Sequence, residues 1–182
     1  VSILSRHASA SALMRLPHEL LETASLLRSI NTTDERQKLK IFVNATSAEF
    51  NTCVLQRDQN LIRESLARLE QGYEIYHKRL DPTYAFLLPA HGAQWSFVMG
   101  DMQKALRWSE IALSTGSMND REDIMLPLRI TQIQSLYELG DFEKLRQKTL
   151  ALYRYLTRKS AHYRIEKALV DHIRILRSGD AG

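Results

Sequence analysis

The sequence is short of the residues that build turns and cross-links, and each shortage excludes a class of structure. Its 182 residues include seven glycines and four prolines, fewer turn residues than an all-β protein or a glycine-rich nucleotide-binding fold needs. The single cysteine, Cys53, excludes a disulfide within the chain and fits a reducing cytosol. No apolar run approaches the roughly 20 residues of a membrane-spanning helix. We therefore expect a cytoplasmic protein without a membrane span.

Signals for targeting and catalysis are also missing. The chain begins at Val1 without a signal-peptide pattern, which points to a processed product or a piece of a longer protein. It has no serine-nucleophile elbow and no glycine loop for phosphate. His162 and Glu166 share a helix face, but a metal site usually needs three or four protein ligands, so a solvated pair is the simpler interpretation. We expect no enzyme activity, no metal and no cofactor.

Apolar and charged side chains are both plentiful. Apolar residues make up 44% of the chain and charged residues 25%, a balance typical of a folded domain. The formal net charge is +4, and it is unevenly spread. The segment from Asp141 to Arg177 holds ten basic residues against four acidic ones. A basic end of this kind attracts acidic proteins, nucleic acid or anionic lipid.

Helical periodicity dominates the chain. Small and apolar residues recur at steps of three and four between Met102 and Leu113, which places them on one helix face. Similar stripes run through Leu39–Val54, Ile62–Leu80 and Phe142–Leu156. Cys53 lies on one of these stripes, so we interpret it as a buried structural thiol. Strict two-residue alternation is nowhere sustained, and we predict no strands.

Short breaks separate the helical stretches. The pairs Arg57-Asp58, Gly100-Asp101 and Gly140-Asp141 stand at three of these breaks. Glycine ends a helix in the left-handed conformation and aspartate caps the next helix, so the two flanking helices become antiparallel neighbours. The sequence predicts one domain over residues 1–182. We expect short helices at 9–16 and 17–30, helix pairs at 34–80, 83–115 and 121–158, and a capping helix at 161–177.

The breaks recur at an interval that indicates repeats. Asp58, Asp101 and Asp141 lie 43 and 40 residues apart, a period typical of stacked helical hairpins. The segment Gly100–Leu106, with Ala112 following, resembles the turn and second helix of a tetratricopeptide repeat. In that family, small residues at the positions of Ala105 and Ala112 allow the helices to pack closely.

Other segments share this resemblance with departures. Tyr137–Leu145 resembles the same turn, but Leu145 and Leu152 stand where alanine is usual, and Arg57 stands where glycine is expected. The spacing also exceeds the family's period of about 34 residues, so the repeats are lengthened. The stretch 126–176 further resembles the C-terminal end of a group of larger bacterial proteins of this type. The resemblance implies an all-α fold of antiparallel helical hairpins, stacked as a short right-handed α-solenoid, and says little about activity.

The best candidate for a partner-binding surface lies within 141–158. Lys144, Lys148, Tyr155 and Arg158 recur at steps of four, seven and three residues, and Arg154 lies close to them. Together they form a cationic stripe with an aromatic ring. Arginine pairs with carboxylate or phosphate through two hydrogen bonds, and tyrosine stacks on rings. The simpler interpretation is an ordinary solvated face opposite the apolar stripe of the same helix.

Three functions remain open at this point. The first is a non-catalytic scaffold that binds a peptide or partner protein, and the positive C-terminal half favours an acidic one. The second is nucleic-acid binding, which the basic residues permit, although the short repeats of RNA-reading helical arrays are not evident. The third is a purely structural part of a larger regulatory protein, with 161–177 as a polar cap. We expect the first.

Overall fold

The computed structural model describes the backbone of residues 3–115 and 122–158, and the side chains of 16–115 and 123–156. Within these residues the regular structure is all helical and contains no strand, which confirms the predicted all-α class. The helices are α1 (Ile3–Ser29), α2 (Glu35–Gln56), α3 (Gln59–Tyr76), α4 (Pro82–Val98), α5 (Met102–Ser114), α6 (Glu122–Glu138) and α7 (Phe142–Arg158). A short 3-10 helix, η1 (His77–Arg79), follows α3. The helix expected at 161–177 lies outside the described residues.

The N-terminal helix corrects one prediction. The two short helices expected at 9–16 and 17–30 are a single helix, α1, with Pro17 inside it. Proline removes a backbone hydrogen bond and normally breaks a helix. Here Pro17 is buried, its carbonyl accepts a hydrogen bond from the Thr52 hydroxyl of α2 at 3.4 Å, and Ala24 packs against alanines of α2. Packing along α2 therefore outweighs the tendency of proline to break the helix at this position.

Aspartate caps the N-terminus of five helices. In each case a carboxylate oxygen accepts one or two hydrogen bonds from backbone N–H groups two or three residues further along, at 2.8–3.2 Å. These bonds satisfy donors that have no partner inside the helix. The capping residues are Asp34, Asp58, Asp81, Asp101 and Asp141. The turn positions therefore fix where the helices begin.

Three of these five caps follow a residue in the left-handed backbone conformation. Gly100 and Gly140 have φ angles of 77° and 71°, and Arg57 has a φ of 54° at the corresponding place. Both glycine turns close in the same way, because the N–H of the following aspartate donates to a carbonyl five residues back, at 2.9 and 3.1 Å. Two of the predicted breaks thus share one geometry. At the third break Arg57 is also left-handed, but its own N–H donates to the carbonyl of Cys53, four residues back, at 2.9 Å.

Replacing Arg57 by glycine should stabilise the protein. The left-handed conformation costs a residue with a Cβ about 1–2 kcal/mol, while glycine adds roughly 0.5–1 kcal/mol of unfolded-chain entropy, so we expect a net gain of about 0.5 kcal/mol. Urea unfolding followed by circular dichroism measures the change. The matched control is Gly100→Ala, which should destabilise the protein. A loss of stability in Arg57→Gly would mean that the exposed arginine side chain matters more than its backbone.

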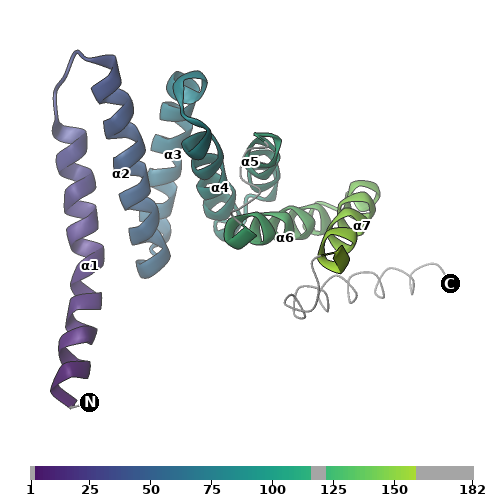
Figure 1. Cartoon of the computed structure of the whole chain (residues 1–182), viewed down its shortest axis with the longest axis horizontal. Coiled ribbons are helices and arrows are strands. Elements are labelled where there is room, and N and C mark those ends of the chain that lie inside the picture. Colours follow the sequence, from purple (N-terminus) through teal and green to yellow (C-terminus); the bar gives the residue numbers. More distant parts are fainter. Residues whose placement is uncertain (1–2, 116–121, 159–182) are drawn as a thin grey trace.

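The apolar core runs along the row of helices. Each helix contacts the next one in the chain, and α4 also contacts α2 and α6. Figure 1 shows the helices side by side in chain order, with α6 lying across the direction of α1 and α2. Phe42, Leu69 and Trp95 are buried together between α2, α3 and α4. Similar clusters fill the space between α4, α5 and α6 and the space between α6 and α7.

Candidate functional site

The predicted cationic stripe lies along α7, next to its buried face. Leu145, Leu152 and Leu156 of this helix are buried in a cluster with α6. Lys144 is exposed, whereas Lys148 and the ring of Tyr155 are half-buried at the border of that face. Three of the predicted residues therefore share one side of α7.

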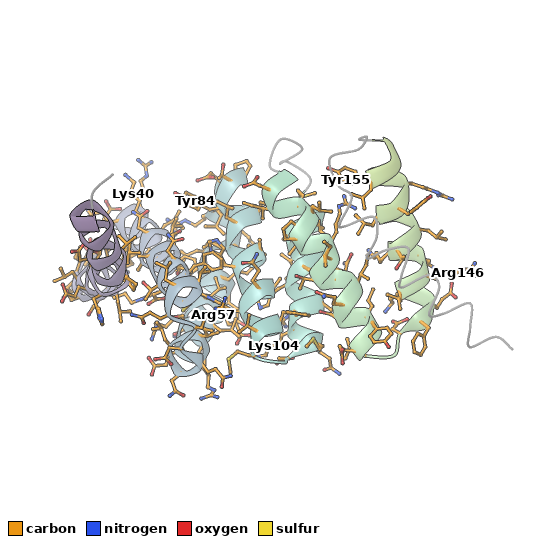
Figure 2. The ribbon with its side chains drawn as sticks, turned by 90° about the horizontal axis from the view of Figure 1, so that it is seen from below. Lys40, Arg57, Tyr84, Lys104, Arg146 and Tyr155 are labelled. Carbon is orange, nitrogen blue, oxygen red and sulfur yellow. The ribbon has the colours of Figure 1, made fainter. Side chains whose placement is uncertain are left out.

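The other two predicted residues, Arg154 and Arg158, are not placed on this side of α7. Arg154 is exposed, and as the neighbour of Tyr155 in the sequence it lies about 100° further round the helix. Arg158 is the last residue of α7, and its side chain lies outside the described ones. In Figure 2, Arg146 lies on the opposite side of α7 from Tyr155, so this outward arginine is a natural control for the stripe.

Two members of the stripe already have partners in the chain. The Lys144 ammonium lies 3.0 Å from the carboxylate of Asp141, the residue that caps α7. The backbone N–H and then the ammonium of Lys144 lower the pKa of Asp141, and the same carboxylate raises the pKa of Lys144. The Tyr155 ring faces the Arg129 guanidinium of α6, with 5.4 Å between the guanidinium carbon and the ring centroid. A ligand on this stripe would compete with these contacts.

A cavity that the sequence pattern did not indicate lies between α2, η1 and the start of α4. Its volume is about 480 Å³. Its apolar wall consists of Leu39, Val43, Leu80 and Tyr84. Its polar rim consists of Arg36, Lys40, Asn44, Arg79 and Asp81. Figure 2 shows Lys40 and Tyr84 near each other on one edge of the molecule, away from Arg57 and Lys104.

Local rules explain how each side of the cavity forms. Arg36, Lys40 and Asn44 stand four residues apart on α2, so their side chains follow one another along one face. On the other side, Asp81 caps α4 by accepting the N–H of Tyr84 at 3.2 Å, which places that ring in the first turn. The four-residue step on α2 is a signal in the sequence for one side of the cavity alone. The two sides lie about 40 residues apart in the chain, so periodicity within a helix cannot show that they meet.

The rim of the cavity is mainly cationic. The Arg79 guanidinium lies 3.1 Å from the Glu35 carboxylate, which also lies 2.8 Å from the Lys38 ammonium. The hydrogen bond from Lys38 and then that from Arg79 lower the pKa of Glu35. Arg36 and Lys40 are exposed, and no carboxylate among the described residues lies within ion-pair distance of either one. Two cations of the rim are therefore open to an incoming anion.

Glu49 forms a third charged cluster, and it is structural. This carboxylate is buried in α2, and Arg28 of α1 donates two hydrogen bonds to it at 2.9 Å each. Arg68 of α3 donates a further bond at 3.0 Å. The two guanidinium groups share one buried carboxylate and link three helices, and their hydrogen bonds leave Glu49 little capacity for a ligand.

The thiol and imidazole groups with shifted pKa values serve packing. Burial raises the pKa of Cys53 to about 11, so it is a protonated thiol at neutral pH and the predicted burial is confirmed. Burial also lowers the pKa of His91 to about 4, so its ring is neutral. That ring stacks on Phe50 with 3.6 Å between centroids. Among the described residues, no three metal-binding side chains gather into a cluster.

None of the described helices combines the length and apolar character needed to cross a bilayer. Comparisons of the chain with protein-family models, with curated proteins and with solved structures found no match. The features of this chain that bear on its function are therefore its fold, the α7 stripe and the cavity.

Proposed function

We propose that this chain is a non-catalytic, cytoplasmic scaffold that binds a peptide or a partner protein. The observation that carries the proposal is the succession of contacts from α2 to α4 and from α4 to α6. These are the first helices of the three pairs, and a stack in which such helices line up presents one extended surface to a partner. Together with the two equivalent Gly-Asp turns, these contacts between first helices support a tetratricopeptide-like, right-handed α-solenoid.

The charged surfaces indicate the chemistry of the partner. Lys144 and Lys148 on α7, and Arg36 and Lys40 at the cavity, are positive groups on the outside of the stack. Positive surfaces steer acidic partners toward a protein and raise the rate of encounter. We therefore infer that the partner protein presents acidic segments. The same α7 cations would also accept phosphates, so nucleic acid is the alternative that an experiment must separate.

A pull-down from source-cell lysate tests the scaffold and its α7 stripe. The baits are the wild-type chain, a Lys144→Glu and Lys148→Glu double variant, and a control with Arg63→Glu and Arg146→Glu. We expect the wild type and the control to retain the same protein, with at least about fivefold less retained by the stripe variant, because each reversal turns an attraction into a repulsion. Nuclease treatment should leave the result unchanged.

Two outcomes would contradict this expectation. Equal retention by wild type and stripe variant would show that the α7 stripe is a solvated face. Loss of the captured protein after nuclease treatment would show that nucleic acid bridges the two, and would favour the nucleic-acid function. Capture of no protein by the wild type would remove the scaffold proposal itself.

A further inference from the structure

We propose that the cavity between α2, η1 and α4 binds a partner segment in which an acidic residue adjoins an apolar one. This inference rests on the proposed scaffold function and gives it a site. The volume of about 480 Å³ lies within the range of about 300–1,000 Å³ typical of ligand pockets. Such pockets combine an apolar lining with a few placed polar groups, and this one has both.

The wall of the cavity selects for an apolar side chain. Leu39, Leu80 and Tyr84 are each partly exposed, so they retain apolar surface that a ligand can cover. Val43 lies behind them at 5% exposure and belongs to the core. An aliphatic side chain that enters this space removes its own surface and that of the wall from water. The Tyr84 ring adds a rigid face at little entropic cost.

The rim selects for a carboxylate. Arg36 and Lys40 lie one helical turn apart on α2, and within the described residues neither has an acidic partner. Like charges at this spacing repel each other, and a carboxylate between them would relieve the repulsion. Asn44, one turn further, adds an amide that can donate to or accept from the peptide backbone.

Glu35 shows that the rim already accepts a carboxylate. The Glu35 carboxylate lies 3.1 Å from the Arg79 guanidinium, and this pair is exposed to solvent. Exposed pairs of this kind contribute little free energy, so an incoming carboxylate can displace Glu35 from Arg79. The Lys38 ammonium would still hold Glu35 at 2.8 Å after that exchange. Glu35 is therefore an internal competitor, and removing its charge should strengthen binding.

The balance of wall and rim favours a peptide over nucleic acid. Four apolar residues line the wall, whereas Arg36 and Lys40 are the rim cations without a carboxylate among the described residues. Binding to nucleic acid depends mainly on many phosphate contacts. A peptide with alternating glutamate and leucine supplies both groups that the cavity takes.

Fluorescence anisotropy with a labelled, end-blocked Glu-Leu alternating peptide tests the site at low salt. We expect the wild type to bind it, and the Arg36→Glu and Lys40→Glu double variant to bind about tenfold more weakly. Glu35→Gln should bind about threefold more tightly, because Arg79 becomes available. Replacing the peptide's leucines by serine, or its glutamates by glutamine, should each weaken binding about tenfold.

The control variant carries Arg63→Glu and Arg146→Glu, which change the net charge equally but lie away from the cavity. Its affinity should stay within about twofold of the wild type, and circular dichroism should show the same helicity for every variant. An equal loss in the control, tighter binding of a single-stranded oligonucleotide, or no binding by the wild type would overturn the site. If the peptide does not bind but the pull-down still captures a protein, the scaffold function stands without this cavity. If the peptide binds but the lysate yields no protein, the cavity stands as a binding site and the scaffold function falls.

Discussion

Replacing Arg28 and Arg68 together by methionine should lower the free energy of unfolding by about 3–5 kcal/mol. The change leaves the Glu49 carboxylate, whose side chain is 3% exposed, without either guanidinium partner. An uncompensated charge inside a protein is among the costliest defects that a substitution can produce. Arg68 also donates to the buried hydroxyl of Ser65 at 3.1 Å, and that bond is lost as well. Urea unfolding followed by circular dichroism measures the loss.

Adding Glu49→Met to the same variant provides the critical comparison. The triple variant replaces all three charges by apolar groups, so most of the lost stability should return. The exposed Arg63→Met is the control, and it should change stability by no more than about 0.5 kcal/mol. A triple variant as unstable as the double variant would mean that the cost comes from lost packing of the arginine side chains. In that case the stranded charge would not be the cause.

Trp108→Ala should destabilise the protein by about 3–5 kcal/mol, because it removes a large side chain that is 1% exposed. The indole packs between α4, α5 and α6 and meets Tyr73 edge-on, with 5.1 Å between ring centroids. Its Nε1 has no hydrogen-bond partner among the described residues, so its removal also relieves an unsatisfied donor. We therefore expect a value near the lower end of the range. Thermal unfolding would show a corresponding fall in Tm.

Gly92 explains how the indole fits, and it supplies a test by coupling. A Cβ at this position would lie 2.8 Å from Trp108 Cδ2, closer than side chains pack, so Gly92→Ala should cost about 1–3 kcal/mol. In the Trp108→Ala background the obstacle is gone, and the same substitution should stabilise α4 by up to about 1 kcal/mol through helix propensity. A double-mutant cycle measures this change of sign. Equal effects of Gly92→Ala in both backgrounds would show that the two residues are not in contact.

The α7 stripe illustrates what spacing alone can and cannot establish. Helical periodicity correctly placed Lys144, Lys148 and Tyr155 on one side of a helix, since that relation depends on 3.6 residues per turn. It gave no information about the Arg129 guanidinium over the Tyr155 ring, which comes from another helix. Periodicity assigns a side chain to a face, whereas the surroundings of that face depend on packing. The stripe stays a prediction that the pull-down tests.

Local chemistry in the sequence determined the helices and the turns between them. The Gly-Asp turns and the apolar stripes act within one or two helical turns of the chain, and the structure has α2 to α7 within about four residues of the expected bounds. Tertiary structure decided two further features, the continuity of α1 and the position of the cavity. Packing on α2 keeps α1 continuous through Pro17, and the cavity joins side chains from α2 and α4. Both depend on contacts between distant segments, and their free energy appears only when helices meet.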